Sequence, residues 1–531
     1  MSFTTTDNLL PPLLQKLIPY YILVLAVAVF YSGVYDNAFL YDDRYLIQKN
    51  SYLHSWHSLG TIFQTYVNSG ALRTGHFYRP LQNVLYLILY QSFGESTFAF
   101  HLLNNILHAA NACLAYMLGR KLGFNPWAVF FAALIWAVHP LHTEAVTYMS
   151  ATADTLGTFF CLLATVIVVP DFAPRKFWLA VPVAILGLLS KETAIILPLL
   201  VMSCIYLLSD RRLDPRTYFK TWPLWLVTLG YMAIRFAIMP FTGKELLNID
   251  PMSVAYGQHF YLRFYTFLAT IPAYLQLLVW PEGLHMDRNF AVRLDPWFFE
   301  VKAGFIVLLA LMAQVFFCRK SKRPALSWGI IWFACAHFPQ TSLLIPVNSL
   351  FLEHWMYLPT IGLSLGAAGA IASKLTNGRI AKAAGICAAF VALTLGIATF
   401  KQNEIWHDPI VFYKNILDRG EPSERSRNNL GVIYIEQGEY AKAMEQFQLT
   451  LKDHDLTPET HQNIAALLSK IPDGQDHTQE EIAELNKALA INPNFLSAYQ
   501  GLADLYTYKG DKEKAAFYQQ KVDELKKNFE P

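Results

Sequence analysis

The chain has 531 residues, of which 54% are apolar and 15% are charged, whereas soluble domains carry about 25% charged residues. This composition excludes an ordinary soluble globular protein and indicates a chain embedded mostly in lipid. The formal net charge of +2 gives no support for nucleic-acid binding. The six cysteines lie in apolar stretches without ligand spacing, so neither a disulfide framework nor a zinc site is predicted.

Eleven apolar segments, some with their polar flanks, are predicted to be transmembrane helices. In chain order they are residues 18–35, 98–119, 126–141, 152–170, 176–190, 193–209, 221–240, 299–318, 325–340, 355–373 and 381–400. A further apolar segment, residues 257–280, contains Arg263 and is interrupted by Pro272. We predict an interfacial or re-entrant helix there.

Short basic loops set the predicted orientation of these helices. The basic residues are Arg120-Lys121, Arg175-Lys176, Arg211-Arg212 with Arg216, Arg319-Lys320 with Lys322-Arg323, and Lys374 with Arg379 and Lys382. Such loops stay in the cytoplasm, so the N-terminus is expected there, and an odd span count places the C-terminal domain on the opposite side. We therefore predict a multi-pass protein of a plasma (inner) membrane with a periplasmic C-terminal domain.

The first outward loop, residues 36–97, opens with the adjacent carboxylates Asp42 and Asp43. One carboxylate of such a pair is suited to deprotonate an acceptor hydroxyl, while the other holds a metal ion or orients the first. The alternative is a solvated loop that merely ends a helix. Further along, Tyr78 and Arg79 precede a short apolar helix, where a guanidinium suits a phosphate and the alternative is an interfacial anchor.

The second outward loop carries His139, His142 and Glu144. Their spacing differs from the i, i+4 histidine pair of zinc proteases, so we expect a hydrogen-bonding cluster near a sugar or phosphate instead of a metal. Asp154 begins the next span, at a depth where a carboxylate is costly unless it is paired.

Two further outward helix ends carry polar side chains. Lys191 and Glu192 lie between two spans, and the lysine either snorkels to the interface or binds phosphate as a point charge. Glu353, His354 and Tyr357 end the fourth outward loop. Because random snorkelling would scatter such groups over both faces, their one-sidedness predicts an enzyme site at the outer surface.

From Asn403 onward the chain is polar and has no spanning segment. Two copies of a repeat of about 34 residues fit the tetratricopeptide spacing, namely Leu430, Gly431, Tyr434, Ala443 and Phe447, and later Tyr499, Leu502, Ala503, Tyr506 and Ala515. Residues 461–493 read as a degenerate copy with an insertion at 471–479. We predict an all-α chain with a membrane domain at 1–402, containing about eleven spans and interfacial helices, and a tetratricopeptide solenoid at 403–531. An unrelated helical bundle is the alternative.

Four motifs resemble, in order and in sequence, those of the transmembrane-and-tetratricopeptide O-mannosyltransferases. They are Asn37-Ala-Phe-Leu-Tyr-Asp-Asp43, His139-Pro-Leu-His-Thr-Glu144-Ala-Val, Ser190-Lys-Glu192 and Tyr357-Leu-Pro-Thr-Ile-Gly362, and Trp406 before the first repeat is also similar. The resemblance covers nearly the whole chain and implies a membrane glycosyltransferase of the GT-C type. More distant relatives would be the protein O-mannosyltransferases and the lipid A aminoarabinose transferases.

The resemblance implies inverting transfer of a sugar from a polyprenyl-phosphate carrier to a hydroxyl of an extracytoplasmic protein. By this analogy Asp42, ahead of Asp43, is the base, and Lys191, Arg79 and His354 contact the donor phosphate. The expected substrate-pocket residues are Tyr78, His139, His142, Glu144, Asp154, Glu192, Glu353 and Tyr357. No metal is obligatory because phosphate is a good leaving group, although Asp42 and Asp43 could hold a divalent ion.

The chain departs from the family pattern at two places. It has Ala151-Thr152-Ala153-Asp154 where many members have Gly-Arg-Ala-Asp, and His354 where an arginine usually stands. Both changes remove a fixed positive charge near the expected donor phosphate. They bear on the identity of the donor more than on the type of reaction.

The expected partners are the lipid-linked donor, membrane lipid and an acceptor protein held by the repeats, with no nucleic acid. A second reading is transfer to a glycan or lipid, or en bloc transfer of an oligosaccharide. A third is a non-catalytic scaffold that recruits partners through its repeats. The scaffold predicts indifference to charge-removing changes at Asp42, Asp43 and Lys191.

Overall fold

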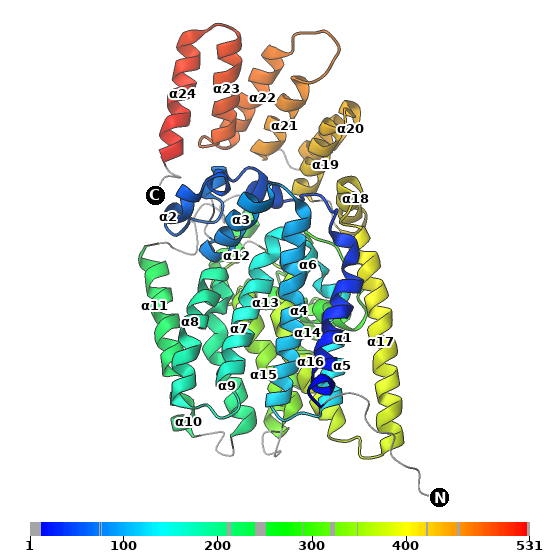
Figure 1. Ribbon diagram of the computed structural model, residues 1–531. Helices are drawn as coiled ribbons and strands as arrows, with labels where there is room; N and C mark the ends of the chain where they lie inside the picture. Colours follow the sequence, from blue (N-terminus) through cyan, green and yellow to red (C-terminus); the bar gives the residue numbers. More distant parts are fainter. Residues whose placement is uncertain are drawn as a thin grey trace, which may run out of the picture. The chain divides into compact units, whose positions relative to one another are not determined.

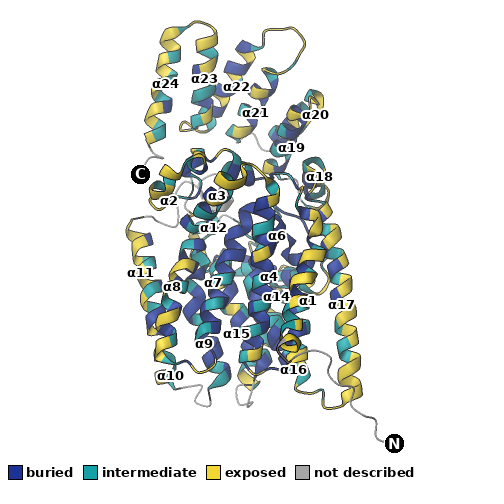
Figure 2. Ribbon diagram, in the orientation of Figure 1, coloured by how far each residue is buried: buried dark blue, intermediate teal, exposed yellow. Residues whose placement is uncertain are grey.

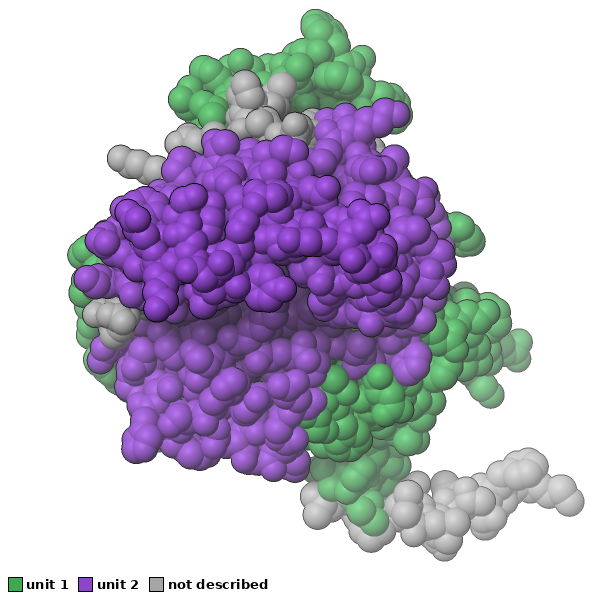
Figure 3. Space-filling view, turned by 90° about the horizontal axis from the view of Figure 1, so that it is seen from above, with its two compact units in different colours: residues 1–36, 96–284, 291–404 green, residues 37–95, 285–290, 405–531 purple. Residues whose placement is uncertain are grey.

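The described residues form helices and no strand, so the predicted all-α class is confirmed (Figure 1). They group into two compact units, which we call the membrane unit (1–36, 96–284 and 291–404) and the repeat unit (37–95, 285–290 and 405–531) (Figure 3). Sequence alone assigns the loop 37–95 to the membrane domain, whereas its contacts group it with the repeats. The computed structural model describes residues 12–73, 75, 77–209, 214–238, 251–288, 290–318, 324–347, 349–420, 423–453 and 457–527.

The membrane unit is a bundle whose longer helices run alongside one another (Figure 1). A helix lies at each of the eleven predicted span positions. The helices are α1 (Pro12–Phe30), α4 (Thr97–Lys121), α5 (Pro126–Ala137), α6 (Thr143–Thr147), α7 (Thr152–Val168), α8 (Pro174–Ser190), α9 (Leu197–Leu208), α10 (Pro215–Phe219), α11 (Trp222–Ala237), α12 (Pro251–Gln258), α13 (Phe260–Val279), α14 (Phe299–Cys318), α15 (Ala325–His337), α16 (Tyr357–Ala372) and α17 (Gly378–Glu404).

Several of these helices can cross a membrane, and the multi-pass architecture is confirmed. Within the described residues, 6 helices are long and apolar enough, or 7 if the pair Pro126–Ala137 and Pro140–Thr147, bent by 54°, counts as one span. The predicted count of eleven is not confirmed. One reason is length, because α8, α9, α11 and α15 have 17, 12, 16 and 13 residues, whereas a span needs about 20.

The predicted interruption at Pro272 is wrong, because α13 continues through it and is one of the 6 span candidates. A proline removes one backbone hydrogen bond, which membrane helices tolerate where neighbours pack around them. Such packing is present. A Cβ at Gly304 of α14 would lie 1.8 Å from the carbonyl oxygen of Leu268, so only glycine permits this approach.

The exterior of the membrane unit is apolar, as a lipid environment requires. Exposed residues line α11 and α17, whereas buried residues fill α7 (Figure 2). The exposed side chains include Ile306 and Phe317 of α14 and Ile386 and Phe390 of α17, with exposed fractions of 64–77%. So large an exposed apolar surface on one unit marks contact with lipid.

Polar and basic residues occupy opposite ends of α7. Asp154 lies in its first turn, whereas Lys121 donates from Nζ to the carbonyl oxygens of Val166 and Val169 at the other end, at 2.6 and 3.1 Å. The 17 residues of α7 rise by roughly 25 Å, close to the thickness of a hydrocarbon core. The basic pairs Arg211-Arg212 and Arg319-Lys320, which also served to predict orientation, lie outside the described residues.

The repeat unit contains the predicted tetratricopeptide helices, which follow α2, α3 and α18 in the chain. In the first copy, a Cβ at Gly431 would lie 2.3 Å from the ring of Phe447, which explains why a small residue is needed where two helices meet. The segment predicted as a degenerate copy, residues 461–493, falls on the helix pair α21 and α22. The helices are α2 (Leu59–Ile62), α3 (Pro80–Phe93), α18 (Pro409–Arg419), α19 (Glu424–Glu436), α20 (Tyr440–Asp453), α21 (Pro458–Leu468), α22 (Thr478–Ile491), α23 (Leu496–Tyr508) and α24 (Lys512–Lys526).

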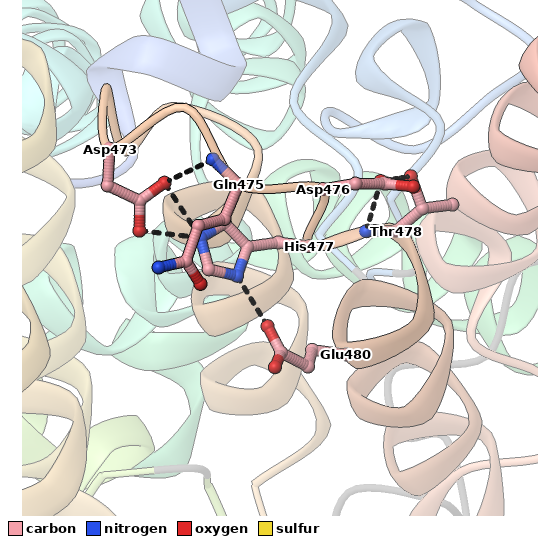
Figure 4. A network of polar contacts seen from close by, with 6 residues as sticks. All are labelled: Asp473, Gln475, Asp476, His477, Thr478 and Glu480. Atoms are coloured by element: carbon pink, nitrogen blue, oxygen red, sulfur yellow. Dashed lines mark hydrogen bonds and ion pairs between the residues drawn. The ribbon is translucent and has the colours of Figure 1, made fainter.

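The insertion between α21 and α22 is closed by a histidine held between two carboxylates (Figure 4). His477 contacts Asp473 through Nε2 at 3.0 Å and Glu480 through Nδ1 at 2.5 Å. Asp476 accepts from the backbone N–H of Thr478, the first residue of α22, at 3.0 Å. The hydrogen bonds to Glu480 and then to Asp473 raise the pKa of His477, because both ring nitrogens donate only in the imidazolium.

This geometry predicts a pH-dependent insertion. The pKa is raised on folding, so its stabilisation is complete below about pH 6.5, the usual histidine pKa, and is lost as the pH rises through the folded-state value. Hydrogen-exchange protection factors of amides 473–482 should therefore fall with rising pH. His477→Gln should abolish this dependence, whereas His461→Gln in α21 should leave it intact. Protection factors of these amides that do not change with pH in the wild-type protein would contradict the proposed role of His477.

Candidate active site

A small polar pocket in the membrane unit brings together three predicted site residues. Its charged and ionisable lining residues are Asp154 at the start of α7, Lys191 after α8, and His354 in the turn before α16. The remaining lining residues are Gly157, Thr158, Cys161, Thr193, Ala194, Ala336, Gln340, Trp355 and Leu358. The pocket therefore combines an ammonium, an imidazole, a carboxylate and small or hydroxyl-bearing side chains.

Lys191 and Asp154 form a buried ion pair in this pocket. The ammonium Nζ donates to Oδ1 of Asp154, and the two side chains are only 7% and 9% exposed. Lys191 is placed there because α8 ends at Ser190 and the backbone turns to an extended conformation. Burying two charges carries a large desolvation cost that the pairing offsets, and in a membrane protein such groups mark functional sites.

Glu144 and His354 form a second carboxylate–base pair. Glu144 accepts from the backbone N–H of His354 at 3.1 Å and contacts Nδ1 of the same residue at 2.8 Å. Because a carboxylate only accepts, Nδ1 carries the proton, and the ring is held in one orientation with Nε2 away from Glu144. Glu144 is 2% exposed and does not line the pocket, whereas its partner His354 does.

The other histidines of the second outward loop are part of the helix packing. His139 Nδ1 accepts from the N–H of Leu141 at 3.2 Å, which makes Nε2 the donor to the carbonyl of Leu278 at 3.0 Å. His142 packs against the ring of Trp136 with centroids 5.0 Å apart. The structure thus gives both histidines a role in holding helices together, and neither lines the pocket.

Tyr357 lies in a buried hydrogen-bonded chain. Its hydroxyl lies 2.7 Å from Nδ1 of His108, whose Nε2 lies 2.7 Å from the carbonyl of Ala137, and Asn111 donates to the same hydroxyl at 3.2 Å. The two other predicted residues of this region are Glu353, which is buried at the start of the same turn as His354, and Glu192, which is half-buried after Lys191.

The predicted catalytic carboxylates lie in the repeat unit and have different environments. Asp43 is 1% exposed, and its Oδ2 accepts from the backbone N–H of Leu40 at 3.1 Å, so it shapes the loop. Asp42 is 44% exposed and is paired with Arg425 of α19. The more accessible carboxylate is therefore the one that the family resemblance favours as base. No group of three or more His, Cys, Asp or Glu side chains in the described chain could hold a metal ion.

Tyr41 connects this loop to three other segments of the repeat unit. Its hydroxyl lies 2.6 Å from Oδ2 of Asp287 and 2.6 Å from the hydroxyl of Ser426. Its backbone N–H donates to the hydroxyl of Tyr413 in α18 at 3.2 Å. Burial, followed by the charge of Asp287, raises the pKa of the Tyr41 hydroxyl well above its usual value, so it remains a donor to Asp287.

Tyr78 and Arg79, two further predicted site residues in the repeat unit, lie directly before α3. The hydroxyl of Tyr78 donates to the carbonyl of Phe63 at 2.9 Å. The Arg79 guanidinium lies over the ring of Phe77, 4.5 Å from its centroid, and is half-buried. Tyr78 therefore has a structural partner.

Sequence reasoning missed Arg425, Asp287 and Ser426 as partners of the acidic loop. They lie 383, 246 and 385 positions from their partners, and each occurs in an ordinary polar stretch. No local sequence signal marks them as partners of this loop.

Family models match two parts of the chain. The model described as dolichyl-phosphate-mannose-protein mannosyltransferase matches residues 80–239, and a tetratricopeptide repeat model matches 424–452 and 496–529. The predicted resemblance is confirmed. The chain is 26% identical to the protein O-mannosyl-transferase F38B6.6 of Caenorhabditis elegans over 77% of its length, and 24% identical to the protein O-mannosyl-transferase TMTC3 of Homo sapiens over 88%.

The chain spans 59% and 56% of the lengths of these two relatives. Among solved structures, it is similar to ArnT from Cupriavidus metallidurans bound to undecaprenyl phosphate, at 12% identity and a TM-score of 0.38, over 97% of this chain and 76% of ArnT. A score this low supports no further argument. The family likeness therefore rests on the matches to the two family models and to the curated relatives.

Proposed function

We propose that this protein is a membrane glycosyltransferase that moves a sugar from a polyprenyl-phosphate donor to a hydroxyl of an extracytoplasmic protein. The observation that carries the proposal is the pocket with Lys191 and His354, each paired with a carboxylate, at the end of α7 away from the basic residues. A lipid-linked phosphate is bound by N–H donors near the membrane surface, and the pocket offers the ammonium of Lys191, which Asp154 balances, beside the imidazole of His354.

In the proposed reaction, the acceptor oxygen attacks the anomeric carbon while the carbon–oxygen bond to the phosphate breaks. The polyprenyl phosphate leaves with the bonding electrons, and Lys191 and His354 stabilise its charge, a role that the family resemblance also gives to Arg79. The hydroxyl proton passes to Asp42 as general base. Attack opposite the leaving group inverts the anomeric centre, and no metal is required because phosphate leaves readily.

The other predicted residues have supporting roles in this proposal. Asp154 and Glu144 hold Lys191 and His354 in place, and the repeats present the acceptor protein. The N-terminus lies in the cytoplasm, and the site and the repeats face the periplasm of a plasma (inner) membrane. The basic residues at one end of α7 and the polar pocket at the other support this orientation for the membrane unit, and the predicted odd span count supports it for the repeats.

Comparison of extracytoplasmic glycoproteins in cells with and without the gene tests this function. Mass spectrometry should find serine or threonine residues that carry a sugar only when the gene is present. If cells without the gene keep all protein modifications but lack a sugar on a glycan or lipid, the acceptor is that glycan or lipid and not a protein. No change in any glycoconjugate would favour the scaffold.

A further inference from the structure

The side chain of Asp42 is held by the first tetratricopeptide helix. Arg425 of α19 donates from its guanidinium to Oδ1 of Asp42, and the same guanidinium lies over the ring of Tyr41, 4.6 Å from its centroid. Both contacts lie within the repeat unit. The guanidinium is thus fixed by a carboxylate and by an aromatic face at once.

The backbone on both sides of Asp42 is also fixed. The carbonyl oxygen of Asp42 accepts from the N–H groups of Tyr45 and Leu46 at 2.9 and 2.7 Å. Tyr41 has a left-handed backbone with φ of 50°, a conformation that is unfavourable for a bulky residue and persists only where its surroundings enforce it. Its hydroxyl contacts to Asp287 and Ser426 supply that enforcement.

Stability does not explain this arrangement of Asp42 and Arg425. The two side chains are 44% and 52% exposed, and ion pairs at such positions contribute little to folding because solvent screens them. The same loop is already attached to α19 by Arg44, which donates with both terminal nitrogens to Glu436 at 2.7 and 3.0 Å. The Asp42–Arg425 pair is therefore dispensable for docking the loop.

We propose that Arg425 is a positioning residue for the reaction, so that a repeat helix supplies part of the active site. This inference rests on the proposed function, in which Asp42 is the base. Arg425 holds the carboxylate in one rotamer, aimed at the acceptor hydroxyl. Without it, Asp42 samples several rotamers, and the fraction of complexes aligned for proton transfer falls.

The test uses the full-length protein in lipid vesicles and the variants Arg425→Gln and Arg425→Lys. Arg425→Gln should lower kcat by about tenfold or more while KM for donor and acceptor stays within about twofold, because alignment fails and binding does not. Arg425→Lys should recover part of kcat. Arg427→Gln, whose parent arginine pairs with Asp453, is the matched control for α19 and should keep wild-type kcat. Glu436→Gln is the comparison variant that weakens docking of the loop, because it removes the carboxylate that Arg44 contacts.

Hydrogen exchange at amides 40–46 separates positioning from docking of the loop. Arg425→Gln should keep wild-type protection there. If Arg425→Gln and Glu436→Gln lose kcat and amide protection to the same extent, Arg425 only docks the loop, and the proposed positioning role is wrong. Unchanged kcat in Arg425→Gln would also overturn it while leaving the proposed function intact, provided that Asp42→Asn is inactive. Full transfer by Asp42→Asn would remove the proposed base itself.

Discussion

The Asp42→Asn variant should lose sugar transfer by at least about 100-fold in kcat while it remains folded and inserted in the membrane. The amide has nearly the volume of the carboxylate but cannot accept the hydroxyl proton. Its ion pair with Arg425 is half-exposed, so its loss should barely change stability. Transfer is measured with reconstituted protein and labelled donor, and folding by the thermal unfolding midpoint in detergent.

Asp453→Asn is the matched control for this change. Asp453, at the end of α20, is also a carboxylate of the repeat unit and is 48% exposed. It pairs with Arg427, which lies on α19 as Arg425 does. The control should transfer sugar at the wild-type rate. Equal activity of Asp42→Asn and the wild-type protein would show that Asp42 is not the base, and a comparable loss in Asp453→Asn would indicate a general effect of the repeats.

The Asp154→Ala variant should destabilise the membrane unit by about 3–5 kcal/mol, because it leaves the ammonium of Lys191 buried without its carboxylate. The expected result is a lower unfolding midpoint and a lower yield of folded protein. Removing both charges in Asp154→Ala with Lys191→Met should restore much of the stability. Transfer should be absent in the double variant, because it lacks Lys191, the proposed contact of the donor phosphate.

The ion pair of Lys176 with Asp171 provides the comparison at the other end of the unit. These side chains are 24% and 54% exposed, so Asp171→Ala should change the unfolding midpoint only slightly. If Asp154→Ala is as stable as the wild-type protein, Asp154 and Lys191 do not form the buried ion pair described above. Full transfer by the charge-free double variant would contradict the role of Lys191.

Much of the fold is predictable because it depends on local patterns. Apolar runs place a helix at every predicted span, and the spacing of Gly431 and Phe447 predicts the tight first repeat. The span count was not confirmed because hydropathy alone does not tell a spanning helix from a shorter buried one. Pro272 misled the prediction because neighbouring helices, absent from any local pattern, stabilise α13 around it.

The site was predictable only in part. The cost of a charge in the membrane indicated that Asp154 needs a partner, but the sequence did not identify Lys191, 37 positions away. Glu144 and His354 are 210 positions apart, so their pairing could not be read from spacing. Equally, nothing local distinguishes Arg425 from Arg427 on the same helix, although only the first contacts Asp42.

Reconstituted transfer is the most direct test of the central claim. Purified full-length protein in vesicles is supplied with polyprenyl-phosphate sugars, beginning with labelled mannose, and with extracytoplasmic proteins from cells that lack the gene. The account predicts label on serine or threonine hydroxyls with the wild-type protein and none with Asp42→Asn. Folded wild-type protein that transfers no label from any polyprenyl-phosphate sugar to protein would contradict it.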